Sequence, residues 1–363
     1  MPEGKKILIV SCSTGSGHFR AAEALRLTCE RLYPDTQIVH LDMANHLDSV
    51  AYIYVVSFYS FFSVLIPGSY KFAYHITDHW FVQKLFKILA PIIAIGSRKF
   101  IKQINDYRAD LIISTHYLPQ FILPKKNTTP IDTIVTDYHA HKIWLSPRNK
   151  NLFVPTEEVK NDLAKIGINS VASGIPIHPS FFEEKNTQEL RTKFNIHNNW
   201  PIILIMPISS GNIKPEQAVR HIFSHNFNQP LNIIAISGKN NEKTFNKLSE
   251  LKQDGQHNFI LLKNVENVDE FMRIADVIIS KAGGLTISEA LFLQKPIIII
   301  NPIPGQEDYN TAYLEKNQYG MQAHSSDDLV SKIELVLSKP DMIHKKSYPD
   351  PSKIILEHIF KTE

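Results

Sequence analysis

The chain has 363 residues, a length that favours two domains over a single hydrophobic core. Apolar residues make up 43% of it and charged residues 21%, which excludes a globally disordered chain. A net charge of +3, without zinc-finger spacing or a long basic run, gives no indication of nucleic-acid binding.

The N-terminus predicts a strand, a glycine turn and a helix. An apolar run at residues 6–12 precedes Ser-Thr-Gly-Ser-Gly-His at 13–18, and apolar residues recur at helical spacing over 21–32. Glu3 and the absence of a cleavage site indicate a first strand and not a signal peptide. The two cysteines of the chain are too few for a disulfide framework, which favours a reducing compartment.

The glycine turn lacks the common nucleotide motifs. Arg20 stands where G-x-G-x-x-G requires its third glycine, and no P-loop lysine is present, so ATP hydrolysis is not expected. His18 is the unusual residue, because it stands where the turn becomes a helix. Taken alone, it is interpreted as a histidine that hydrogen-bonds locally at a helix N-terminus.

A long aromatic segment interrupts the first half of the chain. Residues 49–70 carry no charged side chain but contain serines, tyrosines and a Pro-Gly pair, and lysines and arginines outnumber acids over 71–102. This composition predicts an amphipathic segment lying on an anionic membrane surface. Packing in the domain core or against a partner subunit, and a membrane span, are the alternatives.

Polar residues follow three of the predicted strands in this half. The strands are expected at residues 38–41, 110–114 and 131–136. Carboxyl ends of parallel strands meet at one edge of a sheet, where open α/β folds bind ligands. The side chains that could therefore converge are those of His18, Asp42, His116 and Asp137.

Residues 173–182 contain glycine, two prolines and no aspartate, glutamate, lysine or arginine, which is typical of a linker. We therefore expect an N-terminal domain at 1–172 and a C-terminal domain at 183–363. The last helix of the chain can pack back on the N-terminal domain.

The second half repeats the β–loop–α pattern, with apolar strands predicted at residues 200–206, 231–237, 259–262, 277–279 and 297–300. The expected fold class is therefore α/β, with two Rossmann-like domains facing a cleft. A Lys-Ala-Gly-Gly turn at 281–284 opens a helical pattern at 285–293 and can hold an anion on backbone N–H groups. A polar loop at 305–307 follows the last of these strands.

The serial order of these motifs resembles that of monogalactosyldiacylglycerol synthases and bacterial processive diacylglycerol glucosyltransferases. The resemblance covers nearly the whole chain, and more distantly the C-terminal half is similar to the N-acetylglucosaminyl transferase of peptidoglycan synthesis. The motifs that carry it are residues 13–18 with Ala21-Ala22-Glu23-Ala24, Thr136-Asp137, Trp144, residues 173–177, residues 281–290 and Gly305-Gln306-Glu307 with Asn310.

The resemblance implies a GT-B fold and inverting transfer of galactose or glucose from a UDP-sugar to diacylglycerol. It assigns acceptor and membrane binding to the domain at 1–172 and nucleotide-sugar binding to the domain at 183–363. It places Glu289 on the ribose and His18 at the reacting centre. The other residues of the implied donor site are Ala282, Gly283, Gly284, Leu285 and Thr286 on the diphosphate, Gln306, Glu307 and Asn310 on sugar and phosphate, Asn264 and Val265 beside the uracil, and Gly17 and Gly238.

Elementary chemistry is consistent with these roles. A histidine of near-neutral pKa suits the removal of a proton from an acceptor hydroxyl, and Asp137 is expected to orient it. The chain contains no D-x-D sequence, so we expect neither a metal nor another cofactor. The alternative for Glu289 is an exposed carboxylate favoured by the helix dipole. The chain departs from the family at residues 207–210 and at Asn264, where glycines are common.

The predicted protein is a cytoplasmic enzyme, peripheral on the inner face of the cell membrane, whose partners are a UDP-sugar, diacylglycerol and an anionic lipid surface. A polyprenyl-linked or other lipid acceptor is the alternative within the same chemistry. A nucleotide-sugar-binding protein without turnover is the alternative of another class.

Overall fold

The computed structural model describes residues 4–361 apart from 14, 53–92, 125, 209–210, 240, 252–254 and 341–347. It forms two compact units, of which the first comprises Met1–Pro179, Pro304–Gln306 and Pro349–Glu363. The second comprises Ser180–Ile303 and Glu307–Tyr348. The chain first passes from one unit to the other between Pro179 and Ser180, within the segment 173–182.

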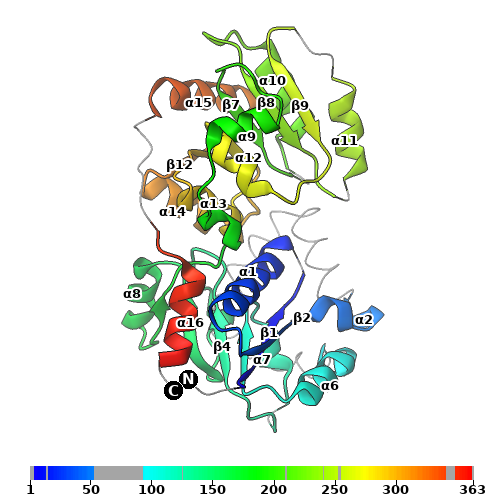
Figure 1. The fold of residues 1–363 in the computed structure, drawn as a ribbon, viewed down its shortest axis with the longest axis vertical. Coiled ribbons are helices and arrows are strands. Elements are labelled where there is room, and N and C mark those ends of the chain that lie inside the picture. The colour runs from blue at the N-terminus through cyan, green and yellow to red at the C-terminus, as the bar shows by residue number, and fades with distance from the viewer. Residues whose placement is uncertain are drawn as a thin grey trace. The chain divides into compact units, whose positions relative to one another are not determined.

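The first unit is built on a six-stranded parallel sheet of order β2-β1-β3-β4-β5-β6 (Figure 1). Its strands are β1 (Lys6–Ser11), β2 (Gln37–Asp42), β3 (Leu111–Ser114), β4 (Ile131–Ile134), β5 (Asn149–Val154) and β6 (Val171–Ala172). Its helices are α1 (Ser16–Leu32), η1 (Met43–His46), α2 (Ser49–Tyr52), α6 (Arg98–Tyr107), α7 (Pro119–Ile122), η3 (Lys142–Trp144), α8 (Glu157–Lys165) and α16 (Pro351–Lys361).

Strand β1 is apolar on both faces because helices cover both sides of the sheet. Ile7 and Ile9 pack in a cluster with residues of α1 and α16. Leu8 and Val10, which point the opposite way, pack in a second cluster with residues of α6. A parallel sheet covered on both faces leaves its strand ends as the place where polar groups can gather.

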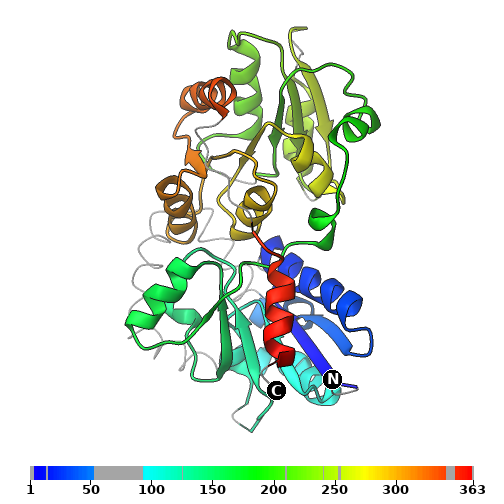
Figure 2. The ribbon, with the colours of Figure 1, turned by 60° about the vertical axis from the view of Figure 1, so that its left-hand side comes forward.

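Helix α16 is the last element of the chain, yet it packs beside α1 in the first unit (Figures 1 and 2). Its Ile355, Leu356 and Ile359 side chains are buried in the cluster that also holds Ile7 and Ile9 of β1. The Tyr33 and Phe360 rings stack with centroids 4.1 Å apart. The C-terminal segment therefore completes the core of the N-terminal unit.

The second unit holds another six-stranded parallel sheet, of order β12-β11-β10-β7-β8-β9. Its strands are β7 (Ile202–Ile205), β8 (Asn232–Ile236), β9 (Asn258–Leu262), β10 (Val277–Ser280), β11 (Ile297–Ile299) and β12 (Gly320–Gln322). Its helices are α9 (Thr187–Lys193), α10 (Pro215–Ser224), α11 (Glu242–Ser249), α12 (Val268–Ile274), α13 (Gly284–Phe292), α14 (Gln306–Lys316) and α15 (Ser326–Ser338), and η4 (Pro179–Phe182) spans the division.

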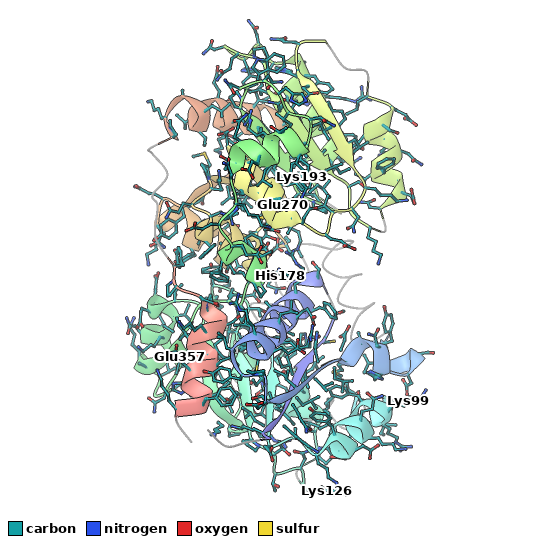
Figure 3. All side chains as sticks on the ribbon, viewed as in Figure 1. Lys99, Lys126, His178, Lys193, Glu270 and Glu357 are labelled. Carbon is teal, nitrogen blue, oxygen red and sulfur yellow. The ribbon has the colours of Figure 1, made fainter. Side chains whose placement is uncertain are left out.

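Ion pairs fasten the start of the second unit to helix α12. The Lys185 ammonium lies 2.6 Å from Oδ2 of the buried Asp269, and Lys193 lies 2.6 Å from Glu270 (Figure 3). Arg273 also donates to the Phe181 carbonyl at 2.9 Å. A buried carboxylate such as Asp269 needs a positively charged partner. The ion pairs with Lys185 and Lys193 therefore hold the segment after Ser180 against α12.

Two predicted turns are wrong, because each contains the first residues of a helix. Helix α1 begins at Ser16, five positions before the apolar periodicity begins, so His18 lies in its first turn. Helix α14 begins at Gln306, where a polar loop was expected, and the Glu307 carboxylate accepts from the backbone N–H of Ile303 at 2.9 Å. Polar first turns carry no apolar periodicity, which is why the pattern missed both.

The predicted membrane-surface segment falls mostly on residues 53–92, which lie outside the described residues. That part of the prediction stays a prediction. Among the helices of the described ranges, none combines the length and apolar character that crossing a bilayer requires.

Candidate active site

In the first unit, the strand order reverses between β1 and β3. After β1 the chain forms β2 on one side of β1, and after β2 it returns to form β3 on the other side. At such a switch point the loops that follow the two strands diverge and leave room for a ligand. His18 lies on the helix that follows β1, and Thr115 directly follows β3. The sheet topology therefore brings a titratable side chain to the position where open α/β sheets bind.

The His18 ring is fixed by two oxygens from distant strand ends. Its Nδ1 lies 2.8 Å from the Thr115 carbonyl oxygen and 3.0 Å from Thr136 Oγ1. A carbonyl oxygen only accepts hydrogen bonds, so Nδ1 carries the proton of the neutral ring. Nε2 is then left with its lone pair and is the ring nitrogen that can accept a proton. The interpretation of His18 as a locally bonded histidine is wrong.

The surroundings of His18 keep it neutral. Burial lowers the pKa of the His18 imidazole below its ordinary 6.5, and the charge of Asp137 and the Thr115 carbonyl raise it only in part. The His116 ring lies edge-on to His18 with centroids 4.8 Å apart, and burial holds the pKa of His116 well below its ordinary value. The Trp144 ring lies 6.1 Å from His18. A neutral imidazole surrounded by aromatic rings can accept a proton.

Asp137 and Asp42 were both expected near His18, and the structure gives them different positions. Asp137 is buried after β4 and influences His18 through its charge, while the oxygens at hydrogen-bonding distance from Nδ1 belong to Thr115 and Thr136. Asp42 accepts from the backbone N–H of Ser13 at 3.0 Å and from its hydroxyl at 2.5 Å. Asp42 therefore fixes the glycine turn and not the histidine.

The second unit has its own switch point, between β7 and β10. The turn at 281–284 lies there and leads into α13, whose first residue is Gly284. The preceding Gly283 adopts an extended conformation (φ −68°, ψ 130°) and has no side chain to cap the helix. The N–H groups of the first turn of α13 are thus oriented as they are in anion sites.

Side chains of helix α14 contact this turn and hold it in place. The buried Asn310 amide donates to the Ala282 carbonyl at 2.9 Å. Glu307 Oε1 lies 2.6 Å from the Lys281 ammonium, while its Oε2 accepts from Ile303. In this structure both residues hold the turn in shape. Their expected contacts with sugar and phosphate stay a prediction.

Glu289 is completely buried on α13. The alternative of an exposed helix-start carboxylate is therefore wrong. A carboxylate removed from water needs hydrogen-bond donors around it. The expected contact of Glu289 with the ribose hydroxyls stays a prediction.

The remaining residues of the expected donor site are spread over several elements. Some follow strands on the side of β7 away from β10, others lie on α13 and α14, and Gly17 lies on α1. Gly238, with φ +99°, follows β8, and Asn264 and Val265 follow β9. With strands about 4.8 Å apart, the ends of β8 and β9 lie roughly 10 and 14 Å from that of β10. Leu285 and Thr286 continue the first turn of α13, Gln306 begins α14, and Gly17 lies beside His18 in the first unit.

Asn301 forms two hydrogen bonds with the backbone of Ile213 in the loop after β7, an arrangement called here the Asn301 clamp. It was not predicted from the sequence. The Asn301 side chain accepts from the Ile213 N–H at 2.9 Å and donates to the Ile213 carbonyl at 2.6 Å. Gly211 passes so close that a Cβ there would lie 2.1 Å from Asn301 Cγ. Asn301 is the first polar residue after the apolar run of β11. This position at a strand end is the feature of the sequence that could have identified it.

The described residues contain no group of three or more histidine, cysteine, aspartate or glutamate side chains arranged to hold a metal ion.

The fold and the two switch points define the chain as a GT-B protein, with a partly buried histidine at the strand ends of one Rossmann-like unit and a glycine turn that opens a helix in the other. Solved structures of this architecture resemble it over nearly its whole length. UDP-GlcNAc 2-epimerase from Neisseria meningitidis has a TM-score of 0.63 at 14% identity, covering 98% of this chain and 100% of that one. Acinetobacter baumannii MurG has a TM-score of 0.58 at 14% identity, covering 98% and 99%. These likenesses concern the fold.

Sequence comparison is more specific. The pattern of the family described as monogalactosyldiacylglycerol (MGDG) synthase matches residues 18–177, and the glycosyltransferase family 28 C-terminal domain matches residues 209–358. A processive diacylglycerol beta-glucosyltransferase from Bacillus cereus (strain B4264) is 30% identical over 351 residues, which are 93% of this chain and 87% of the relative. One from Bacillus subtilis (strain 168) is 27% identical over 379 residues, or 99% and 96%. The chain belongs to the processive diacylglycerol beta-glucosyltransferase family.

The Asn301 clamp predicts an unusual cost for Gly211→Ala. Gly211 has φ +125° and no room for a Cβ, so alanine must strain the backbone and displace Asn301 from Ile213. Gly167 has φ +78° but open space around it, so Gly167→Ala measures backbone strain alone. We expect losses in the free energy of unfolding of about 2–4 kcal/mol and about 1 kcal/mol respectively. Equal losses in urea unfolding would contradict the clamp.

Proposed function

We propose that this protein transfers a hexose from a UDP-sugar to diacylglycerol with inversion at the anomeric carbon, making a glycolipid at a membrane surface. The observation that carries the proposal is the His18 ring, whose Nδ1 is committed to Thr115 and whose Nε2 remains basic, in a chain with full-length relatives named as diacylglycerol glucosyltransferases. Glucose is the hexose in the names of those relatives.

His18 acts first as the base in the proposed reaction. The acceptor hydroxyl gives its proton to His18 Nε2 as its oxygen attacks the anomeric carbon of the sugar. The nearby charge of Asp137 stabilises the imidazolium that forms, since it raises the pKa of His18. Attack from the face opposite the leaving group turns an α-linked donor into a β-linked product, consistent with the beta-glucosyl products in the relatives' names.

The leaving group is UDP, which departs with the electron pair of the broken C–O bond. The N–H groups at the start of α13 can stabilise the charge that develops on the diphosphate, because the helix N-terminus has an effective charge of about half a unit. We propose Glu289 for the ribose hydroxyls, Asn264 and Val265 for the uracil, and Gln306, Glu307 and Asn310 for the sugar and phosphate. On this mechanism no metal ion is required, and chelator-treated enzyme is proposed to remain active.

The acceptor is proposed to reach the enzyme from the inner face of the cell membrane. The support is the composition of residues 49–102, an uncharged aromatic segment followed by a basic one. The exposed Arg98, Lys99 and Lys102 on α6 belong to the same basic stretch. Their charge is suited to anionic headgroups.

The direct test is incubation of the purified protein with diacylglycerol liposomes and UDP-glucose or UDP-galactose, with products identified by mass. We expect hexosyl-diacylglycerol from one or both donors and none from liposomes lacking diacylglycerol. Transfer only to a polyprenyl-linked lipid would favour the alternative acceptor. UDP binding without transfer to either lipid would favour a non-catalytic binding protein and overturn the proposal.

His18→Ala should lower kcat by about 10²–10⁴-fold, the usual contribution of a general base. UDP affinity should stay unchanged, because the residues proposed for the uracil and the ribose, and the N–H groups of α13 proposed for the diphosphate, all lie in the second unit. The control is His221→Ala, which removes a partly exposed histidine of α10. Wild-type turnover by His18→Ala would exclude His18 as the base.

Glu289→Gln should weaken UDP binding by about 10- to 100-fold, as expected when a charged acceptor of ribose hydroxyls is lost. Gln has nearly the same shape, so packing around the buried position is retained. Calorimetry with UDP measures the affinity, and Glu250→Gln, an exposed position in the same unit, is the control. An unchanged dissociation constant in a folded Glu289→Gln protein would refute the ribose role.

A further inference from the structure

We propose that the Thr136 hydroxyl and the Thr115 carbonyl are the groups that position His18, in place of the carboxylate that orients a catalytic histidine in many enzymes. They act through His18 and do not touch the substrate. The inference rests on the proposed function, because it explains how His18 becomes the base of that reaction.

Thr115 holds both the main chain and the ring of His18. Its Oγ1 donates to the His18 carbonyl at 2.9 Å, and its own carbonyl accepts from His18 Nδ1 at 2.8 Å. Thr115 is completely buried, and its N–H bonds to the Val10 carbonyl of β1 at 3.0 Å. The ring is thus tied to the sheet through the rigid end of β3 and not through a flexible side chain.

Thr136 provides the second oxygen from the end of β4. Its Oγ1 lies 3.0 Å from His18 Nδ1, and the residue is only 5% exposed. Because Nδ1 already carries the hydrogen given to Thr115, Thr136 shares that hydrogen as a second acceptor. Two oxygens from different strands then define both the tautomer and the plane of the ring.

These neutral oxygens also favour the protonated ring that forms during the reaction. Acceptors at Nδ1–H stabilise imidazolium more than imidazole, since the cation is the stronger donor. The other titratable groups that act on the ring are Asp137, whose charge favours imidazolium, and His116, whose charge would oppose it. Neutral oxygens stabilise the cation less than a bonded carboxylate would, so the base keeps a pKa suited to proton removal.

The test is Thr136→Val, which keeps the shape of the side chain and removes the acceptor. We expect kcat to fall about 3- to 10-fold, the value of one neutral hydrogen bond, with KM for the UDP-sugar unchanged. The acidic limb of the pH–rate profile should move to lower pH, because an acceptor that favours imidazolium is lost. Thr136→Ser should restore the rate and the limb.

Two controls separate positioning from packing. Thr28→Val makes the same change at a buried hydroxyl of α1 that bonds to the Ala24 carbonyl at 2.9 Å, and it should leave rate and profile unchanged. In a His18→Ala background, Thr136→Val should have no further effect on the residual rate. A wild-type kcat and an unshifted acidic limb in Thr136→Val would overturn this inference. So would a loss of kcat in Thr136→Ser equal to that in Thr136→Val.

The two proposals fail in different ways. If His18→Ala transfers hexose at the wild-type rate, the mechanism under the proposed function is wrong. If His18→Ala is inactive while Thr136→Val is normal, the mechanism stands and only the positioning role of Thr136 is lost.

Discussion

The hydrogen bond from His18 Nδ1 to the Thr115 carbonyl is the interaction on which the chemistry of the first unit depends. It determines which ring nitrogen carries the proton, and so which nitrogen keeps a lone pair. It spans 97 residues of sequence, and the parallel pairing of β1 with β3 brings its two ends together. The helix that bears His18 follows β1 after a short turn, so the register of the sheet helps to fix the position of the imidazole.

The second unit uses the same architecture for a different purpose. Its switch point, between β7 and β10, carries a glycine turn and a helix N-terminus instead of a histidine. Asn310 and Glu307 brace the turn from α14, and Asn301 braces the neighbouring loop. One unit holds the proposed base and the other the backbone N–H groups proposed to stabilise the leaving diphosphate, which are two kinds of group that can assist transfer from a nucleotide sugar.

Much of this could be predicted from the sequence, because apolar strands followed by glycine turns define doubly wound sheets. The α/β class, the two parallel sheets and the GT-B architecture are confirmed. The helix starts at Ser16 and Gln306 were missed, since their first turns are polar and show no apolar period. The buried positions of α14 follow helical spacing, but Glu307, Asn310 and Thr311 are polar and only Leu314 is apolar, so they leave no apolar period in the sequence.

The partners of individual side chains were harder to predict, because they depend on contacts between strand ends. The sequence suggested Asp137 as the group that orients His18, whereas Thr115 and Thr136 lie at hydrogen-bonding distance. A backbone carbonyl leaves no signature in a sequence, so Thr115 could not have been identified by residue type. The Asn301 clamp depends on a close approach to Gly211, which also becomes visible only in three dimensions.

If His18 is the base, its neutral ring must carry the proton on Nδ1. Nitrogen NMR of histidine-labelled protein, with the His18 signals assigned by comparison with His18→Ala, measures this directly. We expect a protonated Nδ1 and an unprotonated Nε2 at neutral pH, with a titration midpoint below the ordinary histidine pKa of 6.5. A proton on Nε2 of the neutral ring, or an imidazolium at pH 7, would contradict it.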